Sequence, residues 1–228
     1  MLEELKEEVC KANKALVTHG LVVLTWGNVS GIDRDKSLFA IKPSGVPYDE
    51  LQACDIVLVD LDGKVAEGKL KPSSDEPTHR ELYKAFAAIG GITHTHSRCA
   101  TAFAQAGREI PPLGTTHADH FHGAVPLARV LTEGEVEADY EANTGKVIVK
   151  RFEAIDPMAV PGVLATGHGP FTWGRDAGDS VKNSVALEEV AHIALLSLQI
   201  DPECQELPAY MQDRHFYRKH GPDATYGQ

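Results

Sequence analysis

The sequence predicts an α/β fold in which helices are layered on a central sheet, and three observations support this prediction. Stretches with apolar residues at helical spacing alternate with short apolar runs broken by glycine and proline, so helices and strands intermix along the chain. No segment has the composition of a linker, so all 228 residues are expected to form one domain, residues 1–228. The apolar fraction of 43% and the charged fraction of 24% are those of an ordinary globular protein.

The first part of the chain is predicted to form one helix followed by strands. Apolar residues recur at helical spacing over residues 2–16, and Gly20 then provides a stop signal. Short apolar runs over residues 21–59 are broken by glycines and prolines, which indicates strands joined by turns. Asp62–Gly63 is typical of a tight turn and predicts a hairpin over residues 56–66.

Capping signals predict the elements in the middle of the chain. Thr78 and Glu81 have the spacing of a capping box, which predicts a helix that begins near Thr78 and ends at Gly90–Gly91. A strand is expected over residues 92–96. A helix over residues 98–106 should follow, with Ser97 as its N-cap.

The longest helix is predicted over residues 177–200, where apolar residues keep helical spacing between Gly178 and Pro202. The longest apolar runs, residues 21–26 and 193–198, are far shorter than the roughly 20 residues needed to cross a bilayer. We therefore expect no membrane span. The direction of the strands cannot be read from periodicity.

Charge and cysteine content restrict the partners and the compartment. A net charge of −11 repels nucleic acid and anionic lipid, so the expected partner is a small molecule held by a local site. The N-terminal segment lacks the basic-then-apolar order of a signal peptide, which predicts a cytoplasmic protein. The four cysteines are scattered without a close pair, and we expect buried free thiols in a reducing environment.

Histidines provide the sharpest local signal for a metal site. In Thr93–His94–Thr95–His96 the two imidazoles are two residues apart, and on a strand such residues point to the same face. His168 lies in a glycine-flanked loop after an apolar run, where sites often form. Three histidines that leave a fourth position open are a catalytic zinc arrangement. The alternative is that these histidines are solvated rings without a shared ion.

A second histidine cluster competes with the first one. It consists of His117, His120 and His122, and spacing alone does not rank it below the first cluster. If the segment is a loop or a short helix, some of these rings would simply cover a site or face solvent.

Several motifs together resemble the class II aldolase and epimerase family, and within it the sugar-phosphate epimerases most closely. The match runs from the first helix to the end of the chain and rests on the order of its motifs. These motifs are Thr25–Ser30, Ile41–Gly45, Lys71–His79, His94–Arg98 and Gly167–Phe171. The resemblance implies a three-layer αβα fold with a central, mostly antiparallel sheet flanked by helices.

The resemblance also implies a metal centre and a phosphate pocket. One Zn²⁺ per subunit would be held by His94, His96 and His168, with Asp75 beside it. Asp75 also suits the positive end of a helix, and both roles can hold together. The implied phosphate-binding residues are Gly27, Asn28, Lys42, Ser44, Gly45, Ser73 and Ser74. Glycine N–H groups and serine hydroxyls bind phosphate without a basic protein.

Further roles implied by the resemblance concern proton transfer and assembly. Asp119 and Tyr226 would transfer protons, while Thr115 and Glu141 would support the site and His220 would lie near the substrate phosphate. The C-terminal tail, residues 214–228, would reach a neighbouring subunit, which implies a homo-oligomer, expected to be a cyclic tetramer with active sites at subunit interfaces. His120 and His122 occupy positions where tyrosines are expected in the nearest relatives, so the shape of the sugar pocket differs there.

The implied substrate is a small phosphorylated ketose. The expected reaction interconverts L-ribulose 5-phosphate and D-xylulose 5-phosphate by zinc-assisted cleavage and re-formation of the C3–C4 bond, and other pentulose 5-phosphates are alternative substrates. One rival is an aldolase acting on a related sugar phosphate such as L-fuculose 1-phosphate; aldolases of the family carry glutamate where this chain has Asp75. The other rival is a non-catalytic interaction module, against which the three histidines argue.

Overall fold

The computed structural model describes residues 2–221 and residue 224, so Tyr226 lies outside the described residues. The elements are, in chain order, α1 (Glu3–Thr18), β1 (Gly27–Asp33), β2 (Leu38–Ile41), the 3-10 helix η1 (Ala53–Asp55), β3 (Val57–Asp60), β4 (Val65–Glu67), α2 (Glu76–Ala85), β5 (Gly91–Thr95), α3 (Arg98–Gln105), α4 (Thr115–Ala118), β6 (Leu127–Ala128), α5 (Glu133–Arg151), β7 (Gly162–Ala165), β8 (Gly169–Gly174), α6 (Ala177–Ile200) and α7 (Ala209–His220).

The strands form one eight-stranded sheet in the order β4-β3-β2-β1-β5-β8-β7-β6. Neighbouring strands pair antiparallel throughout, except that β6 and β7 pair in parallel. The predicted mostly antiparallel sheet is therefore confirmed. The hairpin predicted around Asp62–Gly63 is also confirmed, since it joins β3 to β4, and Gly63 has the positive φ of 87° that such turns use.

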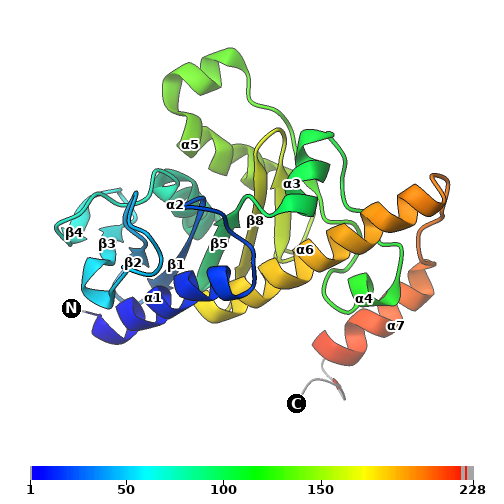
Figure 1. Ribbon diagram of the computed structural model, residues 1–228, viewed down its shortest axis with the longest axis horizontal. Coiled ribbons are helices and arrows are strands. Elements are labelled where there is room, and N and C mark those ends of the chain that lie inside the picture. Colours follow the sequence, from blue (N-terminus) through cyan, green and yellow to red (C-terminus); the bar gives the residue numbers. More distant parts are fainter. Residues whose placement is uncertain (1, 222–223, 225–228) are drawn as a thin grey trace.

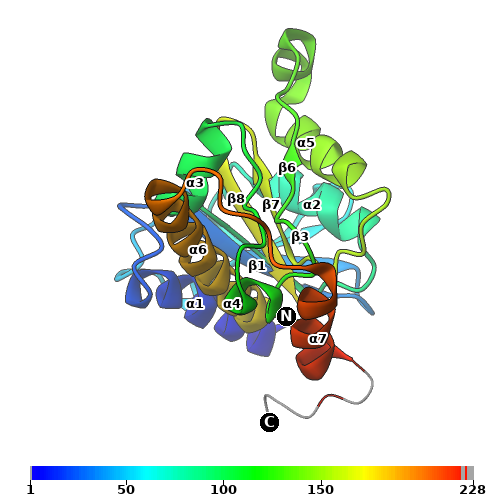
Figure 2. The same cartoon turned by 90° about the vertical axis from the view of Figure 1, so that its right-hand side faces the viewer.

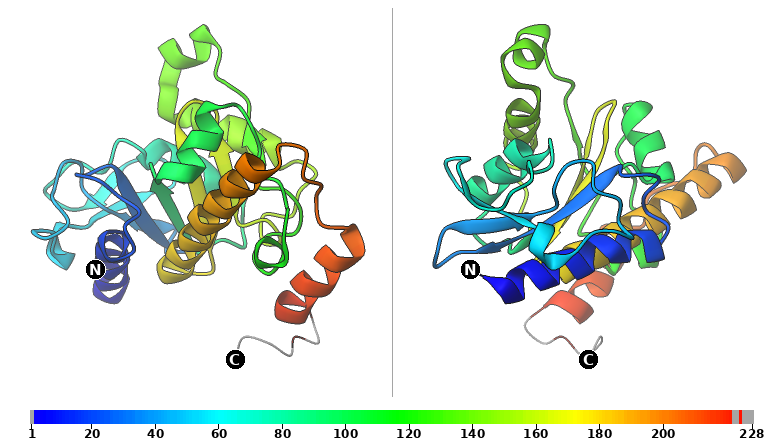
Figure 3. Two further views of the ribbon diagram at one scale, coloured as in Figure 1. Left: turned by 45° about the vertical axis from the view of Figure 1, so that its right-hand side comes forward. Right: turned by 60° about the vertical axis from the view of Figure 1, so that its left-hand side comes forward.

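Helices cover both faces of the sheet and complete the predicted three layers (Figures 1 and 2). Helices α1, α3 and α6 lie on one face, whereas α2 and the C-terminal half of α5 lie on the other. The N-terminal part of α5 projects beyond the sheet, and α7 lies apart from it beside α4 (Figure 3). The fold is thus a three-layer α/β arrangement.

Alternation along the strands explains why both faces are covered. In β2, Phe39 and Ile41 pack into the larger core, and Ala40 between them packs into the smaller core beneath α1. In β3, Val57 and Val59 join the larger core while Leu58 joins the smaller one. Because successive side chains of a strand point to opposite faces, apolar residues at every position require a core on each side.

Helix α1 is fixed to the sheet by a buried amide as well as by apolar packing. Val9 and Leu16 are fully buried on the face of α1 that meets the sheet. Between them the side chain of Asn13 donates to the carbonyl of Val29 at 3.0 Å and accepts from its N–H at 2.8 Å. Asn13 thus pairs with the backbone of β1 as a neighbouring strand would, and no buried polar atom of the pair is left unsatisfied.

The helix predicted to begin near Thr78 starts earlier and ends earlier than expected. Its N-cap is Asp75, and the Thr78 hydroxyl donates to the carbonyl of Glu141 at 2.6 Å, so the predicted capping box is wrong. The helix ends at Ala85, well before Gly90–Gly91. The guanidinium of Arg34 donates to the carbonyls of Tyr83, Phe86 and Ile89 at 2.7–2.9 Å, which satisfies the groups that a longer helix would have used.

Two further expectations concern the cysteines and membrane-spanning segments. The cysteines are free as expected, but only Cys10 among them is buried, whereas Cys54 is exposed. Among the described residues, no helix has both the length and the apolar character required to span a membrane.

Candidate metal centre and phosphate pocket

The middle of the sheet places two histidines at the end of β5. His94 pairs with Asn28 of β1 on one side and with Phe171 of β8 on the other, and His96 follows directly after the strand. The ring of Phe171 stacks on the His94 ring with centroids 4.2 Å apart. These contacts leave His94 only 1% exposed, whereas His96 is exposed at the mouth of the site. Strand geometry therefore turns both rings toward the same space, as the two-residue spacing indicates.

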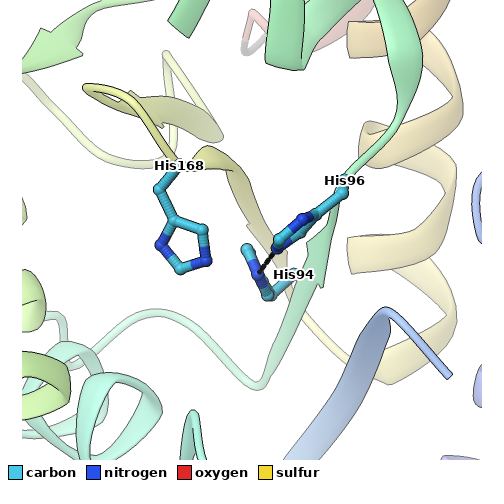
Figure 4. A group of neighbouring side chains, drawn as sticks. All are labelled: His94, His96 and His168. Atoms are coloured by element: carbon cyan, nitrogen blue, oxygen red, sulfur yellow. Dashed lines mark hydrogen bonds between the residues drawn. The ribbon is translucent and has the colours of Figure 1, made fainter. Parts of the chain in front are cut away.

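The turn between β7 and β8 supplies the third histidine. Gly167 adopts φ 72°, and the N–H of His168 donates to the carbonyl of Ala165 at 3.0 Å, so the turn is tight. Figure 4 shows the three rings facing one another, with one ring nitrogen of His168 directed toward His94. One ligand nitrogen from each ring lies within 4.8 Å of the others.

Hydrogen bonding supports a shared cation rather than three unrelated rings. The Nδ1 atom of His94 lies 3.0 Å from the carbonyl of Pro170, which can only accept, so Nδ1 carries the proton and Nε2 keeps its lone pair. That Nε2 lies 3.1 Å from Nε2 of His96. Two nitrogens bound to one tetrahedral zinc ion lie about 3.3 Å apart for Zn–N bonds of about 2.0–2.1 Å. The donor set therefore fits a divalent metal such as zinc.

Burial keeps these imidazoles neutral. Burial lowers the pKa of His94 to about 3, and repulsion from His96 is a further cause. Burial also lowers the pKa of His168 to about 3, and there the further cause is repulsion from His94. The pKa of His96 is also lowered by burial. Neutral rings hold the lone pairs that a metal needs, so the site is prepared to bind a cation at neutral pH.

The histidines form one wall of a cavity of about 390 Å³. The remaining walls come from the loop before β1, the loops that contain Ser44 and Ser73, and the beginning of the second half of α5. The lining includes these residues predicted for the site from the sequence: Gly27, Asn28, Lys42, Ser44, Gly45, Ser73, Ser74, Asp75, His94, His96, Glu141 and His168. Segments from six separate parts of the chain thus meet in one cavity.

Two loops that line the cavity are joined by backbone hydrogen bonds. The N–H of Ser44 donates to the carbonyl of Lys71 at 3.0 Å, and the N–H of Ser73 donates to the carbonyl of Lys42 at 2.9 Å. Gly27 packs so closely against β5 that a Cβ at this position would lie 2.8 Å from the carbonyl oxygen of His94. Serine hydroxyls and a glycine without a side chain allow an anion to approach the backbone closely.

Lys42 adds a buried positive charge to the cavity. It is 2% exposed, its Nζ donates to the carbonyl of Pro43 at 3.2 Å and lies 5.0 Å from the centre of the Tyr48 ring. Burial lowers its pKa to about 8. An ammonium group held in this way is poorly solvated and gains from an anion placed beside it.

Asp75 lines the cavity close enough to the histidines for its charge to act on His96 and His168. Its carboxylate makes no capping hydrogen bond to α2 and instead accepts from the amide of Asn28 at 2.6 Å. The other amide atom, Oδ1 of Asn28, is buried and has no hydrogen-bond partner among the described residues. The position of Asp75 suits both a role beside the histidines and the positive end of α2.

Thr115, Asp119 and His220 lie outside this cavity within the single chain. Asp119 follows α4, and its carboxylate accepts from His215 at 3.1 Å and from Arg218 at 3.0 Å, both on α7. Burial raises the pKa of Asp119, but these hydrogen bonds outweigh it and leave the pKa below its usual value. His220 contacts the same segment, with Nε2 3.0 Å from the carbonyl of Asp119. Their predicted roles at the histidine site would need a neighbouring subunit.

The competing histidine cluster does not converge. His117 contacts the carbonyl of Gly123 at 2.7 Å, while His122 contacts Asp213 at 2.8 Å. Within the described part of the chain, the histidines whose ligand atoms come together are His94, His96 and His168. The second cluster therefore joins α4 and its following loop to α7.

Sequence reasoning missed two aromatic residues of the cavity, Trp26 and Tyr140. Trp26 is half exposed, and its ring lies 6.4 Å from that of His96. The hydroxyl of Tyr140 lies 3.3 Å from Nδ1 of His168. Trp26 lies within the motif Thr25–Ser30 but was given no role, whereas nothing in the sequence around Tyr140 marks it.

Comparison with known proteins agrees with this geometry. Residues 7–195 match the family model described as "Class II Aldolase and Adducin N-terminal domain". Among solved structures, an L-fuculose 1-phosphate aldolase is 29% identical with a TM-score of 0.79, and the match covers 93% of this chain and 94% of that one. YgbL from Klebsiella pneumoniae is 25% identical with a TM-score of 0.74, and the match covers 94% of this chain and 99% of that one.

A third structure shares the fold at lower identity. The L-fuculose-1-phosphate aldolase from Thermus thermophilus is 23% identical with a TM-score of 0.69, and the match covers 89% of this chain and 98% of that one. The family model spans most of the chain, including every residue of the histidine group and the loops that contain Ser44 and Ser73. The chain therefore belongs to the family of class II aldolase and adducin N-terminal domains.

Proposed function

We propose that this chain is an L-ribulose-5-phosphate 4-epimerase that interconverts L-ribulose 5-phosphate and D-xylulose 5-phosphate. The observation that carries the proposal is that one cavity joins two kinds of wall. Three neutral histidines, from the end of β5 and the β7–β8 turn, line it together with Lys42 and the two joined loops, the first of which follows β2 on the other side of β1. A phosphorylated ketose has matching ends, since its carbonyl and hydroxyl oxygens suit a metal and its phosphate suits the loops.

The residues of the chain would bind and orient the ketose for cleavage of its C3–C4 bond. A divalent metal at His94, His96 and His168 supplies Lewis-acid polarisation of the ketose carbonyl when it is bound. Lys42, Ser44 and Ser73 hold the phosphate, so the fragment that carries it stays in the cavity. Because C4 is not adjacent to the carbonyl, its proton is not acidified, and breaking and re-forming the C3–C4 bond changes the configuration at C4 without an oxidant.

Atoms and charges balance in this reaction. The C4 hydroxyl gives up its proton, the C3–C4 electron pair moves to the carbonyl end, and the products are the enediolate of dihydroxyacetone and glycolaldehyde phosphate. Rotation of the aldehyde exposes its other face, and re-formation of the bond returns the proton to the new C4 oxygen. We propose that Asp119 and Tyr226 of a neighbouring subunit transfer this proton, one on each face of the aldehyde.

This role for Asp119 and Tyr226 makes the assembly part of the proposal. We propose a homo-oligomer, a cyclic tetramer, in which the tail at residues 214–228 reaches the next subunit and each subunit is a single domain located in the cytoplasm. Thr115, Glu141 and His220 would complete the sugar and phosphate contacts. The contacts of Asp119 with His215 and Arg218, which belong to the first part of this tail, support placing the two predicted proton-transfer groups near one another.

The second candidate is a class II aldolase on a related sugar phosphate. It is favoured by the 29% identity to an L-fuculose 1-phosphate aldolase over 93% of this chain. Both activities would use the same metal and phosphate contacts, and they differ in whether the fragments leave the cavity. Asp75, which is shorter than the glutamate expected of an aldolase, supports the epimerase.

The test is incubation of the zinc-loaded protein with L-ribulose 5-phosphate, followed by chromatography of the products. We expect D-xylulose 5-phosphate to accumulate to equilibrium, and we expect a chelator to stop this. Accumulation of dihydroxyacetone and glycolaldehyde phosphate alone would favour the aldolase. Absence of any turnover with either L-ribulose 5-phosphate or L-fuculose 1-phosphate would contradict both candidates.

A further inference from the structure

Among the described residues, Tyr140 is the one side chain that hydrogen-bonds to Nδ1 of His168, the ring nitrogen that faces away from His94. Its hydroxyl lies 3.3 Å from Nδ1 of His168, with the ring centroids 6.0 Å apart. In Figure 4 the nitrogen of His168 that faces His94 is the opposite one, Nε2. Tyr140 also lines the cavity and is 37% exposed to it and to solvent. One hydroxyl therefore contacts both the metal centre and the sugar space.

A break in α5 puts Tyr140 in this position. Asp139 leaves helical geometry with φ −171° and ψ 94°, and its carboxylate then accepts from the N–H of Ala142 at 3.0 Å as the cap of the second half of the helix. The carbonyl of the next residue but one, Glu141, accepts from the Thr78 hydroxyl of α2 at 2.6 Å. Tyr140 thus begins a helical segment whose backbone is anchored to α2 through the neighbouring Glu141.

The hydrogen-bond partners of His94 and His168 differ in what they can do. The Pro170 carbonyl beside His94 can only accept, so it fixes one tautomer of that ring. The Tyr140 hydroxyl beside His168 can donate or accept, so it allows either tautomer. A metal at Nε2 of His168 requires the lone pair of that atom, which places the proton on Nδ1. Tyr140 must then accept, and its own proton can no longer point at His168.

From this we propose that Tyr140 holds His168 in its metal-binding tautomer and presents its hydroxyl proton to an oxygen of the bound ketose. Tyr140 is then a positioning residue for the metal and a hydrogen-bond donor to the sugar. The second half of this inference rests on the proposed function, whereas the first half needs only a metal. Partners of this kind typically change metal affinity by about ten- to a hundredfold when they are removed.

The first experiment measures metal affinity without any sugar. Metal-free wild type, Tyr140→Phe and the control Tyr210→Phe, which alters an exposed tyrosine of α7, compete with a chromophoric chelator for Zn²⁺. Because phenylalanine keeps the ring, all three proteins should unfold at the same urea midpoint. We expect the Kd for zinc to rise about tenfold in Tyr140→Phe and to stay constant in the control. A Kd within about twofold of wild type would overturn the positioning role.

The second experiment uses the zinc-saturated proteins and separates KM from kcat. A lost hydrogen bond to the sugar that is the same in substrate and transition state raises KM and leaves kcat unchanged. We expect KM for L-ribulose 5-phosphate to rise about five- to tenfold in Tyr140→Phe, with an unchanged Kd for inorganic phosphate, because the Tyr140 hydroxyl contacts His168 of the histidine group. An unchanged KM would overturn the donor role. Wild type that does not turn over the pentulose would refute the proposed function, and the zinc Kd would still decide the first half.

Discussion

Replacing Lys42 by methionine should stabilise the free protein and at the same time remove its affinity for phosphate. Lys42 is 2% exposed, and among the described residues its ammonium group has the Pro43 carbonyl at 3.2 Å and the Tyr48 ring at 5.0 Å but no carboxylate beside it. Such a charge is costly to bury and is tolerated for what it binds. Methionine has a similar length and no charge, so it can fill the same space.

The size of the effect follows from the pKa of Lys42. Burial lowers this pKa from 10.5 to about 8, which corresponds to about 3 kcal/mol of destabilisation at neutral pH. The substitution also loses the contact between the ammonium and the Tyr48 ring, worth about 1 kcal/mol. We therefore expect Lys42→Met to raise the free energy of unfolding by about 2 kcal/mol at pH 7.

The pH dependence gives an independent check of the cause. Below about pH 8 the folded and the unfolded states both carry the proton, so the full penalty is present. Between about pH 8 and 10.5 the unfolded chain binds more protons at this residue than the folded chain does, so the stability of wild type rises relative to the variant. The advantage of Lys42→Met should therefore disappear as the pH approaches 10.5.

The assay is urea unfolding of both proteins at several pH values, with and without inorganic phosphate. Phosphate should stabilise wild type by binding the folded state and should leave the variant unchanged. A Lys42→Met protein that is less stable than wild type at pH 7, or that gains as much from phosphate, would refute the reasoning.

Three further predictions concern the surroundings of the site. Asp119→Asn should lower epimerase turnover about a hundredfold at unchanged zinc content by elemental analysis, and full turnover would exclude Asp119 from proton transfer. Glu188→Ala should cost about 2 kcal/mol in urea unfolding, because this carboxylate accepts from the N–H groups of Cys99 and Ala100 at 2.8 and 3.0 Å; Glu188→Gln should cost less, and equal losses would contradict the charge-assisted bond. Gly91→Ala should cost about 2 kcal/mol or more, since its Cβ would overlap the carbonyl of Asp176, and an unchanged midpoint would show that the sheet yields there.

Local patterns predicted the elements whose signals lie within their own sequence. The longest helix has the predicted bounds, residues 177–200, because apolar spacing and terminal signals agree along its length. Ser97 stands at the predicted N-cap of α3, but its hydroxyl makes no capping bond. The N–H groups there are satisfied by Glu188, a residue of α6 that is distant in the sequence. The start of α3 could therefore be predicted from the sequence, whereas the carboxylate that satisfies its first N–H groups could not.

Elements whose limits depend on distant partners were misjudged. Helix α2 ends early because Arg34, which lies far before it in the sequence, binds carbonyls in its last turn and beyond its end. The direction of the strands was not readable from periodicity, because alternation is the same in parallel and antiparallel sheets. Only the resemblance to a family indicated the antiparallel sheet that the structure has.

The candidate site divides in the same way. His94 and His96 could be paired from their strand spacing, and the structure brings His168 to them across the β7–β8 turn. Tyr140 could not be identified, since its contact with His168 depends on the break in α5 at Asp139. Asp119 was recognised by resemblance alone, and its distance from the cavity within one chain reflects what a single sequence cannot specify, the arrangement of subunits.

The most direct test of the account is a titration of metal-free protein with Co²⁺ followed by visible absorption. If three imidazoles surround one ion, the visible absorption band of Co²⁺ in a site of low coordination number should saturate at one equivalent per chain. Zinc should displace the cobalt and abolish the band, and the band should be absent in His94→Ala. Absorption that never saturates, or a band that survives in His94→Ala, would contradict the claim that these rings hold a single metal ion.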